Sequence, residues 1–177
     1  MAYQLEEINR RLKEDPAEFV AECDGVYQKR LETAADRILE RMKVSPIVLL
    51  SGPSGSGKTT TALKLEQELE RRGVQTHTIS MDNYFKTLNR RTAPRNAEGD
   101  IDYESPKLLD MDLLDETFTK LSRGEWVIVP KFEFARQMRN DSRGTPLKLD
   151  KNEIAIFEGI HAHTGDISGR HPEATTL

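Results

Sequence analysis

One stretch of eight residues constrains this chain more than any other feature. Residues 52–59 match the phosphate-binding loop pattern G-x-x-x-x-G-K-[ST] in full. An apolar, β-branched run at 46–51 precedes them and predicts a buried parallel strand, and residues 60–72 follow with apolar side chains at helical spacing. Because the pattern carries meaning only between a strand and a helix, this context indicates a nucleoside triphosphate site in an α/β domain.

The residue types in this stretch suit the chemistry of phosphate binding. Glycines let the backbone curl until successive N–H groups point at phosphate oxygens, and the start of the following helix adds a partial positive charge. Lys58 is expected to reach the β- and γ-phosphates, and the Thr59 hydroxyl is expected to bind Mg²⁺. The expected nucleotide contacts are Gly52, Pro53, Ser54, Gly55, Ser56, Gly57, Lys58, Thr59 and Thr60.

From residue 46 onward, strand and helix patterns alternate. Strands are expected at 46–51, 75–80, 126–129 and 153–157, and helices at 60–72 and from Ser105-Pro106 to Gly124, with a loop at 87–103. Residues 131–150 predict a hairpin-like excursion that turns at 143–146, and no further helix or strand is expected in the tail. The alternation predicts a P-loop NTPase-type three-layer α/β/α fold with a mostly parallel sheet.

The N-terminal region is predicted to be helical over residues 3–43, with a break at Asp15-Pro16. Apolar residues recur at helical spacing from Tyr27 to Met42, so this amphipathic helix needs a surface to cover. Either it is an extension packed on the domain, or it is an arm for dimerisation or for another partner. We therefore expect a helical extension at 1–44 and a phosphate-loop domain at 45–177.

Bulk composition narrows the class of protein. The net charge of −4 argues against a nucleic-acid partner, and a single cysteine, Cys23, excludes an intrachain disulfide. The mean hydropathy is −0.64, no apolar run approaches membrane-spanning length, and the polar N-terminus does not resemble a signal peptide. These features favour a cytoplasmic protein with no membrane or nucleic-acid partner, and a homo-oligomer is left open.

Two carboxylates stand at the expected ends of strands. Asp82 directly follows the strand at 75–80, and Glu158 ends the strand at 153–157. Parallel sheets place their sites at the carboxyl ends of strands. Asp82 could accept the proton of an attacking hydroxyl, lie in the second shell of a metal, or be a turn residue. Glu158 fits a Walker-B-like carboxylate that holds Mg²⁺ directly or through water, or an ordinary strand-end residue.

Other polar residues give weaker signals. Asp102 lies just before a helix, where a carboxylate often serves helix solvation, and Arg139 could contact a phosphate or the substrate, or be a solvated surface charge. His161 and His163 alternate, which would suit a metal, but two histidines without further ligand spacing favour a surface loop.

Five segments, taken in order, resemble the phosphoribulokinase/uridine kinase family of P-loop kinases. The resemblance covers residues 46–162. Each segment after the first matches its family pattern only loosely, but the five segments in this order are specific together. The segments are Gly52–Thr60, Asp82–Lys86, Ile101–Pro106 followed by Leu109-Asp110, Val129–Phe134, and Phe157–Ile160.

The resemblance implies a phosphotransferase that uses ATP and Mg²⁺ to phosphorylate a hydroxyl of a nucleoside or sugar-like acceptor. It implies that Lys58 and Asp82 are catalytic, with Asp82 as the base, and that Thr59 and Glu158 serve the metal. Asp102 would contact ribose-like hydroxyls of the acceptor. The substrate-binding residues it implies are Asp82, Tyr84, Asp102, Phe132, Gln137 and Arg139.

The chain departs from the family pattern at the acceptor side. Phe132 stands where uridine kinases carry Tyr, Glu133 stands for Asp, and Gln137 stands for a base-contacting His. These changes remove polar contacts to a pyrimidine. The family's arginine-rich lid lies beyond the fourth strand and has no counterpart in these residues, so we expect either a fragment of a longer protein or dependence on another chain.

Two other classes of function compete with a kinase. A regulatory NTPase or GTPase switch would need a guanine-specificity segment of the Asn-Lys-x-Asp type, and the sequence holds none. A nucleotide-binding module without turnover would bind Mg-ATP but release no ADP in response to an acceptor. The acceptor-dependent kinase is the leading interpretation.

Overall fold

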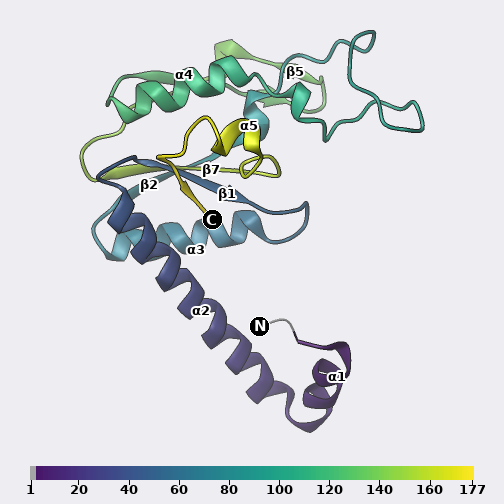
Figure 1. The fold of residues 1–177 in the computed structure, drawn as a ribbon, viewed down its shortest axis with the longest axis vertical. Coiled ribbons are helices and arrows are strands. Elements are labelled where there is room, and N and C mark those ends of the chain that lie inside the picture. The colour runs from purple at the N-terminus through teal and green to yellow at the C-terminus, as the bar shows by residue number, and fades with distance from the viewer. Residues whose placement is uncertain (1–2) are drawn as a thin grey trace.

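The computed structural model describes residues 3–177. Its helices and strands alternate over most of the chain (Figure 1). The α-helices are α1 (Leu5–Glu14), α2 (Pro16–Arg41), α3 (Lys58–Arg71), α4 (Met111–Ser122) and the short α5 (Gly165–Ser168). The strands are β1 (Ile47–Ser51), β2 (Gln75–Ser80), β3 (Val127–Val129), β4 (Phe132–Glu133), β5 (Met138–Arg139), β6 (Thr145–Leu147), β7 (Glu153–Gly159) and β8 (Thr175–Thr176).

The central sheet is parallel throughout, with strand order β2-β7-β1-β8. Its register matters for function, because Glu158 of β7 lies opposite Leu50 of β1 and Ser80 of β2. The three strands therefore end together at one edge. At that edge the phosphate-binding loop follows β1, a short 3-10 turn that contains Asp82 follows β2, and a tight turn follows β7.

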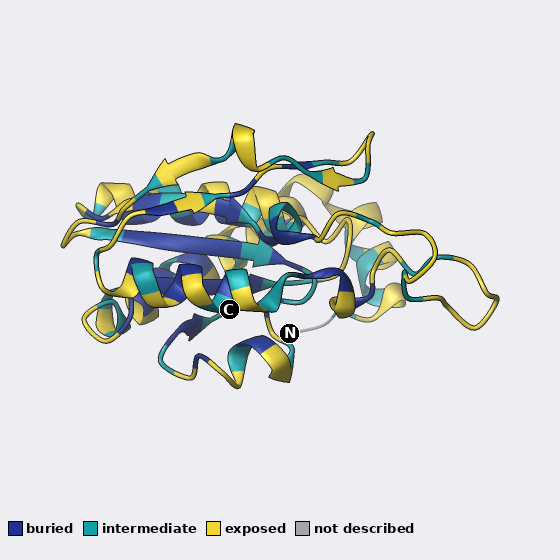
Figure 2. Cartoon of the chain, turned by 90° about the horizontal axis from the view of Figure 1, so that it is seen from above, coloured by how far each residue is buried: buried dark blue, intermediate teal, exposed yellow. Residues whose placement is uncertain are grey.

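Helices cover both faces of this sheet, as Figures 1 and 2 show. Successive residues of β1 point to opposite faces, so Val48 and Leu50 pack with α2 and α3 while Ile47 and Leu49 pack with α4 and the segments around it. On the second face the Phe118 ring of α4 meets Phe157 of β7 edge to face, with ring centres 4.6 Å apart. This arrangement confirms the expected three-layer α/β/α fold.

The N-terminal helices follow the sequence pattern. The Asp15 side chain accepts a hydrogen bond from the Glu18 backbone at 2.9 Å, and Pro16 takes the first position of α2. The first half of α2 extends away from the sheet, where Phe19 packs against Tyr3 (Figure 1).

The second half of α2 belongs to the packing of the core. Leu31, Ala35 and Ile38 are buried in the cluster that α3 and the sheet form. The division expected between residues 44 and 45 stays a prediction, and this packing ties the second half of α2 to the sheet.

Three local expectations were wrong. Ser105-Pro106 opens only a 3-10 turn, and α4 begins at Met111, because the Asp110 side chain caps it by accepting from the Leu113 backbone. The strand at 127–129 does not join the central sheet. It pairs antiparallel with β6, which occupies the segment expected to be a turn.

The hairpin turn lies elsewhere, at residues 134–137 between β4 and β5. The tail also holds more structure than expected, because α5 and β8 follow β7 and β8 adds to β1 as a fourth parallel strand. The strand β8 was not predicted, because it has only two residues and lies in a tail of polar composition. None of the helices within residues 3–177 combines the length and the apolar character needed to cross a membrane.

A pair of substitutions in α2 tests this division of the helix. Ile38 is 1% exposed in the core, so Ile38→Ala should lower the free energy of unfolding by about 2–5 kcal/mol, since it leaves a cavity. Val26 is 42% exposed, so Val26→Ala should change it by less than about 0.5 kcal/mol. Urea denaturation measures both. Equal effects would contradict the packing of the second half of α2 on the sheet.

Candidate functional site

The phosphate-binding loop has the backbone that its glycines predict. Gly55 and Gly57 adopt φ values of 73° and 85°, in the left-handed region, and α3 begins directly afterwards at Lys58. A Cβ atom on Gly52 would lie 2.8 Å from the Ser56 Oγ and 3.1 Å from the Lys58 Cγ, so the lysine stem crosses over this glycine. The Lys58 Nζ donates to the Pro53 carbonyl at 2.9 Å, which holds it across the loop.

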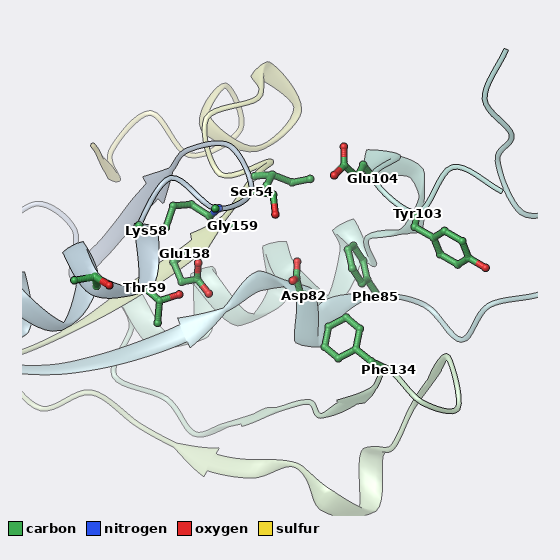
Figure 3. Close-up of a pocket in the computed structure, with 14 residues that line it drawn as sticks. Ser54, Lys58, Thr59, Asp82, Phe85, Tyr103, Glu104, Phe134, Glu158 and Gly159 are labelled. Atoms are coloured by element: carbon green, nitrogen blue, oxygen red, sulfur yellow. The ribbon is translucent and has the colours of Figure 1, made fainter. Parts of the chain in front are cut away.

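A cavity of about 550 Å³ opens beside this loop at the carboxyl edge of the sheet (Figure 3). Lys58, Asp82 and Glu158 all line it, each from the end of a different strand or the helix after it. In Figure 3, Asp82 lies between the Lys58–Glu158 side and a group of aromatic rings. The lining residues are Ser54, Gly55, Gly57, Lys58, Thr59, Thr60, Asp82, Phe85, Tyr103, Glu104, Phe134, Glu158, Gly159 and Ile160.

Asp82 lies in an unusual electrostatic position. Burial raises the pKa of its carboxyl above the ordinary value, while Coulombic interactions with Lys58 and His161 act in the opposite direction. Within residues 3–177 its carboxylate makes no hydrogen bond and no ion pair to another side chain. A partly buried carboxylate without a partner is a candidate proton acceptor.

A second cavity, of about 210 Å³, adjoins the first and shares Phe85, Tyr103 and Phe134 with it. Its walls are mostly apolar: the Phe85 and Phe132 rings meet edge to face at 5.6 Å, and Phe132 meets Phe134 at 5.2 Å. The full lining is Phe85, Lys86, Leu88, Tyr103, Leu108, Phe132, Phe134 and Gln137.

Gln137 supplies an amide to this apolar cavity. Its backbone has φ of 52°, which a residue other than glycine rarely adopts, and its carbonyl accepts from the Leu88 backbone at 2.9 Å. Its side-chain Nε2 donates to the Tyr103 hydroxyl at 3.2 Å. An uncommon backbone conformation that places a polar side chain in a cavity is a feature of binding sites.

The structure separates three expected substrate contacts from both cavities. Tyr84 is fully buried beside Phe157, and burial raises the pKa of its hydroxyl to about 12. Asp102 lies in a turn, where its side chain accepts from the Glu104 backbone at 3.1 Å.

Arg139 is the third of these residues. It pairs with Asp110 at 2.6 Å and with Asp141 at 2.8 Å. Because Asp110 also caps α4, Arg139 attaches the β4–β5 hairpin to the start of that helix. Its place in the structure therefore indicates a structural role.

Sequence reasoning missed six residues that line the first cavity: Phe85, Tyr103, Glu104, Phe134, Gly159 and Ile160. All six lie inside segments that resemble the kinase family. Membership of those segments was the only signal. Loop conformation decides which residue of such a segment faces the cavity.

Thr59 and Glu158 line the first cavity, and both carry side-chain oxygens of the kind that Mg²⁺ takes as ligands. Residues 3–177 hold no cluster of three or more His, Cys, Asp or Glu side chains that could enclose a metal by themselves. Mg²⁺ suits such a site, because it keeps several waters and takes its remaining ligands from substrate phosphates. His161 and His163 do not form a metal cluster there.

Comparison with known proteins identifies the family. The model of the phosphoribulokinase/uridine kinase family matches residues 47–167. The chain belongs to this family. It is 32% identical over 121 residues to a uridine kinase of Staphylococcus aureus, and 34% identical over 113 residues to one of Schizosaccharomyces pombe. A solved structure assigned as a fructose transport system kinase, from Silicibacter sp. TM1040, is 26% identical with a TM-score of 0.58.

These similarities cover only part of the other proteins. The alignments include 68% of this chain but 55% of the S. aureus kinase, and 64% of this chain but 24% of the S. pombe kinase. The Silicibacter structure is matched over 73% of this chain and 62% of its own. The match begins at β1, so α1 and α2 both lie outside the family model.

The raised pKa of Asp82 predicts a gain in stability when its charge is removed. Because the folded pKa lies above the unfolded one, the carboxylate is destabilising at neutral pH, and that cost vanishes below the unfolded pKa. Asp82→Asn should therefore raise the melting temperature at pH 7, and the difference from wild type should shrink toward pH 3. Thermal denaturation across this pH range measures it. A lower melting temperature for the variant at pH 7 would contradict a raised pKa of Asp82 in the folded protein.

Proposed function

We propose that this protein is a kinase that transfers the γ-phosphate of ATP to a hydroxyl of a nucleoside or sugar-like acceptor. One observation carries the proposal. The cavity beside the phosphate-binding loop adjoins an aromatic cavity of suitable size for one ring, and Asp82 lines the first of them near Phe85 and Phe134, which both cavities share. A nucleotide-binding module without turnover would need no second cavity next to a carboxylate.

The loop side of the cavity suits Mg-ATP. Backbone N–H groups of residues 54–60 and the N-terminus of α3 would hold the phosphates, and Lys58 would leave the Pro53 carbonyl to reach the transferred group. The charged residues that line the cavity are Lys58, Asp82, Glu104 and Glu158. With three carboxylates and one ammonium there, the phosphates need the charge of Mg²⁺, for which Thr59 and Glu158 offer oxygen ligands.

The aromatic side suits the acceptor. Lys86 is the one charged residue among those that line the second cavity, and Arg139 is already paired with two carboxylates. A neutral acceptor with a flat or apolar face therefore fits better than a phosphorylated sugar. Gln137 and Tyr103 offer hydrogen bonds to its polar edge.

Asp82 would act on the acceptor hydroxyl between these two sides. The hydroxyl proton passes to the carboxylate as the acceptor oxygen bonds to the γ-phosphorus, and the bond from that phosphorus to the bridging oxygen breaks to release ADP. The protein contributes mainly position and charge, because phosphoryl transfer requires little covalent assistance.

Acceptor-dependent ADP release tests the proposal. Wild type is assayed with Mg-ATP over a panel of nucleosides, sugars and sugar phosphates, and at least one neutral acceptor should stimulate turnover. Lys58→Ala should abolish that turnover, and Asp82→Asn should lower it far more than it lowers ATP binding. No stimulation by any acceptor, with ATP still bound, would favour a module without turnover. Unchanged turnover in Asp82→Asn would refute its role as the base.

A substitution at Gln137 tests the acceptor side. Gln137→Leu keeps the volume of the side chain but removes the amide, so the KM for the acceptor should rise by about 2- to 10-fold, the value of one hydrogen bond. The Kd of ATP should stay constant. Gln67→Leu, on the exposed surface of α3, is the control. An unchanged KM for every acceptor in the panel would remove Gln137 from the site.

A further inference from the structure

His161 is unlike the other three histidines of the chain. His77 and His171 contact carboxylates at 3.2 and 3.0 Å, and His163 is exposed. The Nε2 atom of His161 is buried, and it has no hydrogen-bond partner within residues 3–177. Such an atom is costly to leave unsatisfied, so it points to a partner that joins it during function.

The backbone holds His161 in a fixed place. The Ile160 carbonyl accepts from the Ser51 Oγ at 3.3 Å, at the end of β1. The His161 carbonyl accepts from both the backbone N–H and the hydroxyl of Thr164, each at 2.9 Å. These bonds attach the turn after β7 to the neighbouring strand and to the start of α5. The backbone of His161 is therefore held at the carboxyl edge of the sheet.

Asp82 lies at this same edge. Its strand, β2, pairs with β7, and a Cβ atom on Gly159 would lie only 3.0 Å from the Cβ of Met81. The segments after β2 and β7 are thus in direct contact. The charge of His161 also acts on the Asp82 carboxyl and favours its ionised form.

The two side chains are chemically complementary. The Asp82 carboxylate accepts hydrogen bonds and has no partner among the described side chains, while the imidazole Nε2 can carry a hydrogen to donate. The carboxylate lacks a hydrogen-bond donor, and the imidazole Nε2 lacks an acceptor. The hydrogen bond between them is not formed in this structure, so it would form when acceptor and nucleotide occupy the cavity that Asp82 lines.

We propose that His161 is a positioning residue for phosphoryl transfer, whose Nε2–H hydrogen-bonds the Asp82 carboxylate and turns its free oxygen toward the acceptor hydroxyl. The inference rests on the proposed kinase function. His161 gives up no proton: the acceptor proton passes to Asp82 and then to solvent, and the imidazole keeps its hydrogen throughout.

Paired variants test this role. His161→Leu should lower kcat by roughly 10- to 100-fold, the cost of a misplaced catalytic group, while the KM of the acceptor and the Kd of ATP stay within about twofold. His161→Gln retains an N–H near the position of Nε2 and should recover most of the lost rate. His163→Leu, at the exposed histidine two residues later, is the matched control and should behave as wild type.

A double variant separates positioning from a general structural role. If His161 acts through Asp82, then adding His161→Leu to Asp82→Asn should cause no further loss of kcat. An additive loss, a Gln variant no better than the Leu variant, or an effect confined to ATP binding would each overturn the proposal. Circular dichroism and melting curves identify any variant that fails to fold. If His161→Leu does not fold, the kcat of His161→Gln decides whether the proposal holds.

A spectroscopic measurement keeps the inference separate from the kinase activity. Nitrogen NMR of the imidazole should show the Nε2–H of His161 entering a hydrogen bond when Mg²⁺ and a non-hydrolysable ATP analogue are added with the acceptor panel. The signal should be absent in Asp82→Ala, which removes the acceptor, whereas an Asn amide oxygen could still accept from Nε2–H. Wild type without turnover would refute the kinase function alone, whereas no change at Nε2 in wild type would refute the role of His161.

Discussion

The site depends on the parallel register of three strands. Because Glu158 pairs in register with Leu50 and Ser80, the strands β1, β2 and β7 end at one edge of the sheet. A segment that carries residues of the site follows each strand there. Backbone hydrogen bonding fixes this alignment, and a slip of one residue would turn every side chain of a strand to the other face. The buried faces of β1 and β7 resist such a slip, since both are covered by helices.

The rest of the site is built on loops attached to that edge. The β4–β5 hairpin brings Phe132, Phe134 and Gln137 next to Tyr103, and the Arg139–Asp110 pair attaches the hairpin to α4. The start of α4 is therefore both a helix cap and the attachment point of the hairpin that lines the second cavity. Arg139, which was expected to touch substrate, is paired there with Asp110 and Asp141 and lines neither cavity.

The sequence predicted most of the architecture and part of the site. The phosphate-binding loop, the two strand-end carboxylates and the parallel strands β1, β2 and β7 follow from local patterns, because buried runs and glycine-rich turns leave strong signals. The strand β3 was predicted, but its antiparallel pairing with β6 was not. The short strands β4, β5, β6 and β8 were not predicted individually, because two or three residues leave no periodicity. Tyr84 and Asp102 also lie away from the cavities, since a motif fixes the segment but not which side chain faces inward.

By itself the sequence determined the chemistry at the phosphates: a loop that binds a triphosphate, a lysine, and carboxylates at the ends of strands. Only the tertiary structure decided what lies opposite them. It joined Phe85, Tyr103 and Phe134 from separate loops into one wall, and it buried the His161 Nε2 instead of leaving it in a surface loop. The reason is physical: local patterns encode the backbone of each segment, whereas burial and charge at a site arise from segments far apart in the chain.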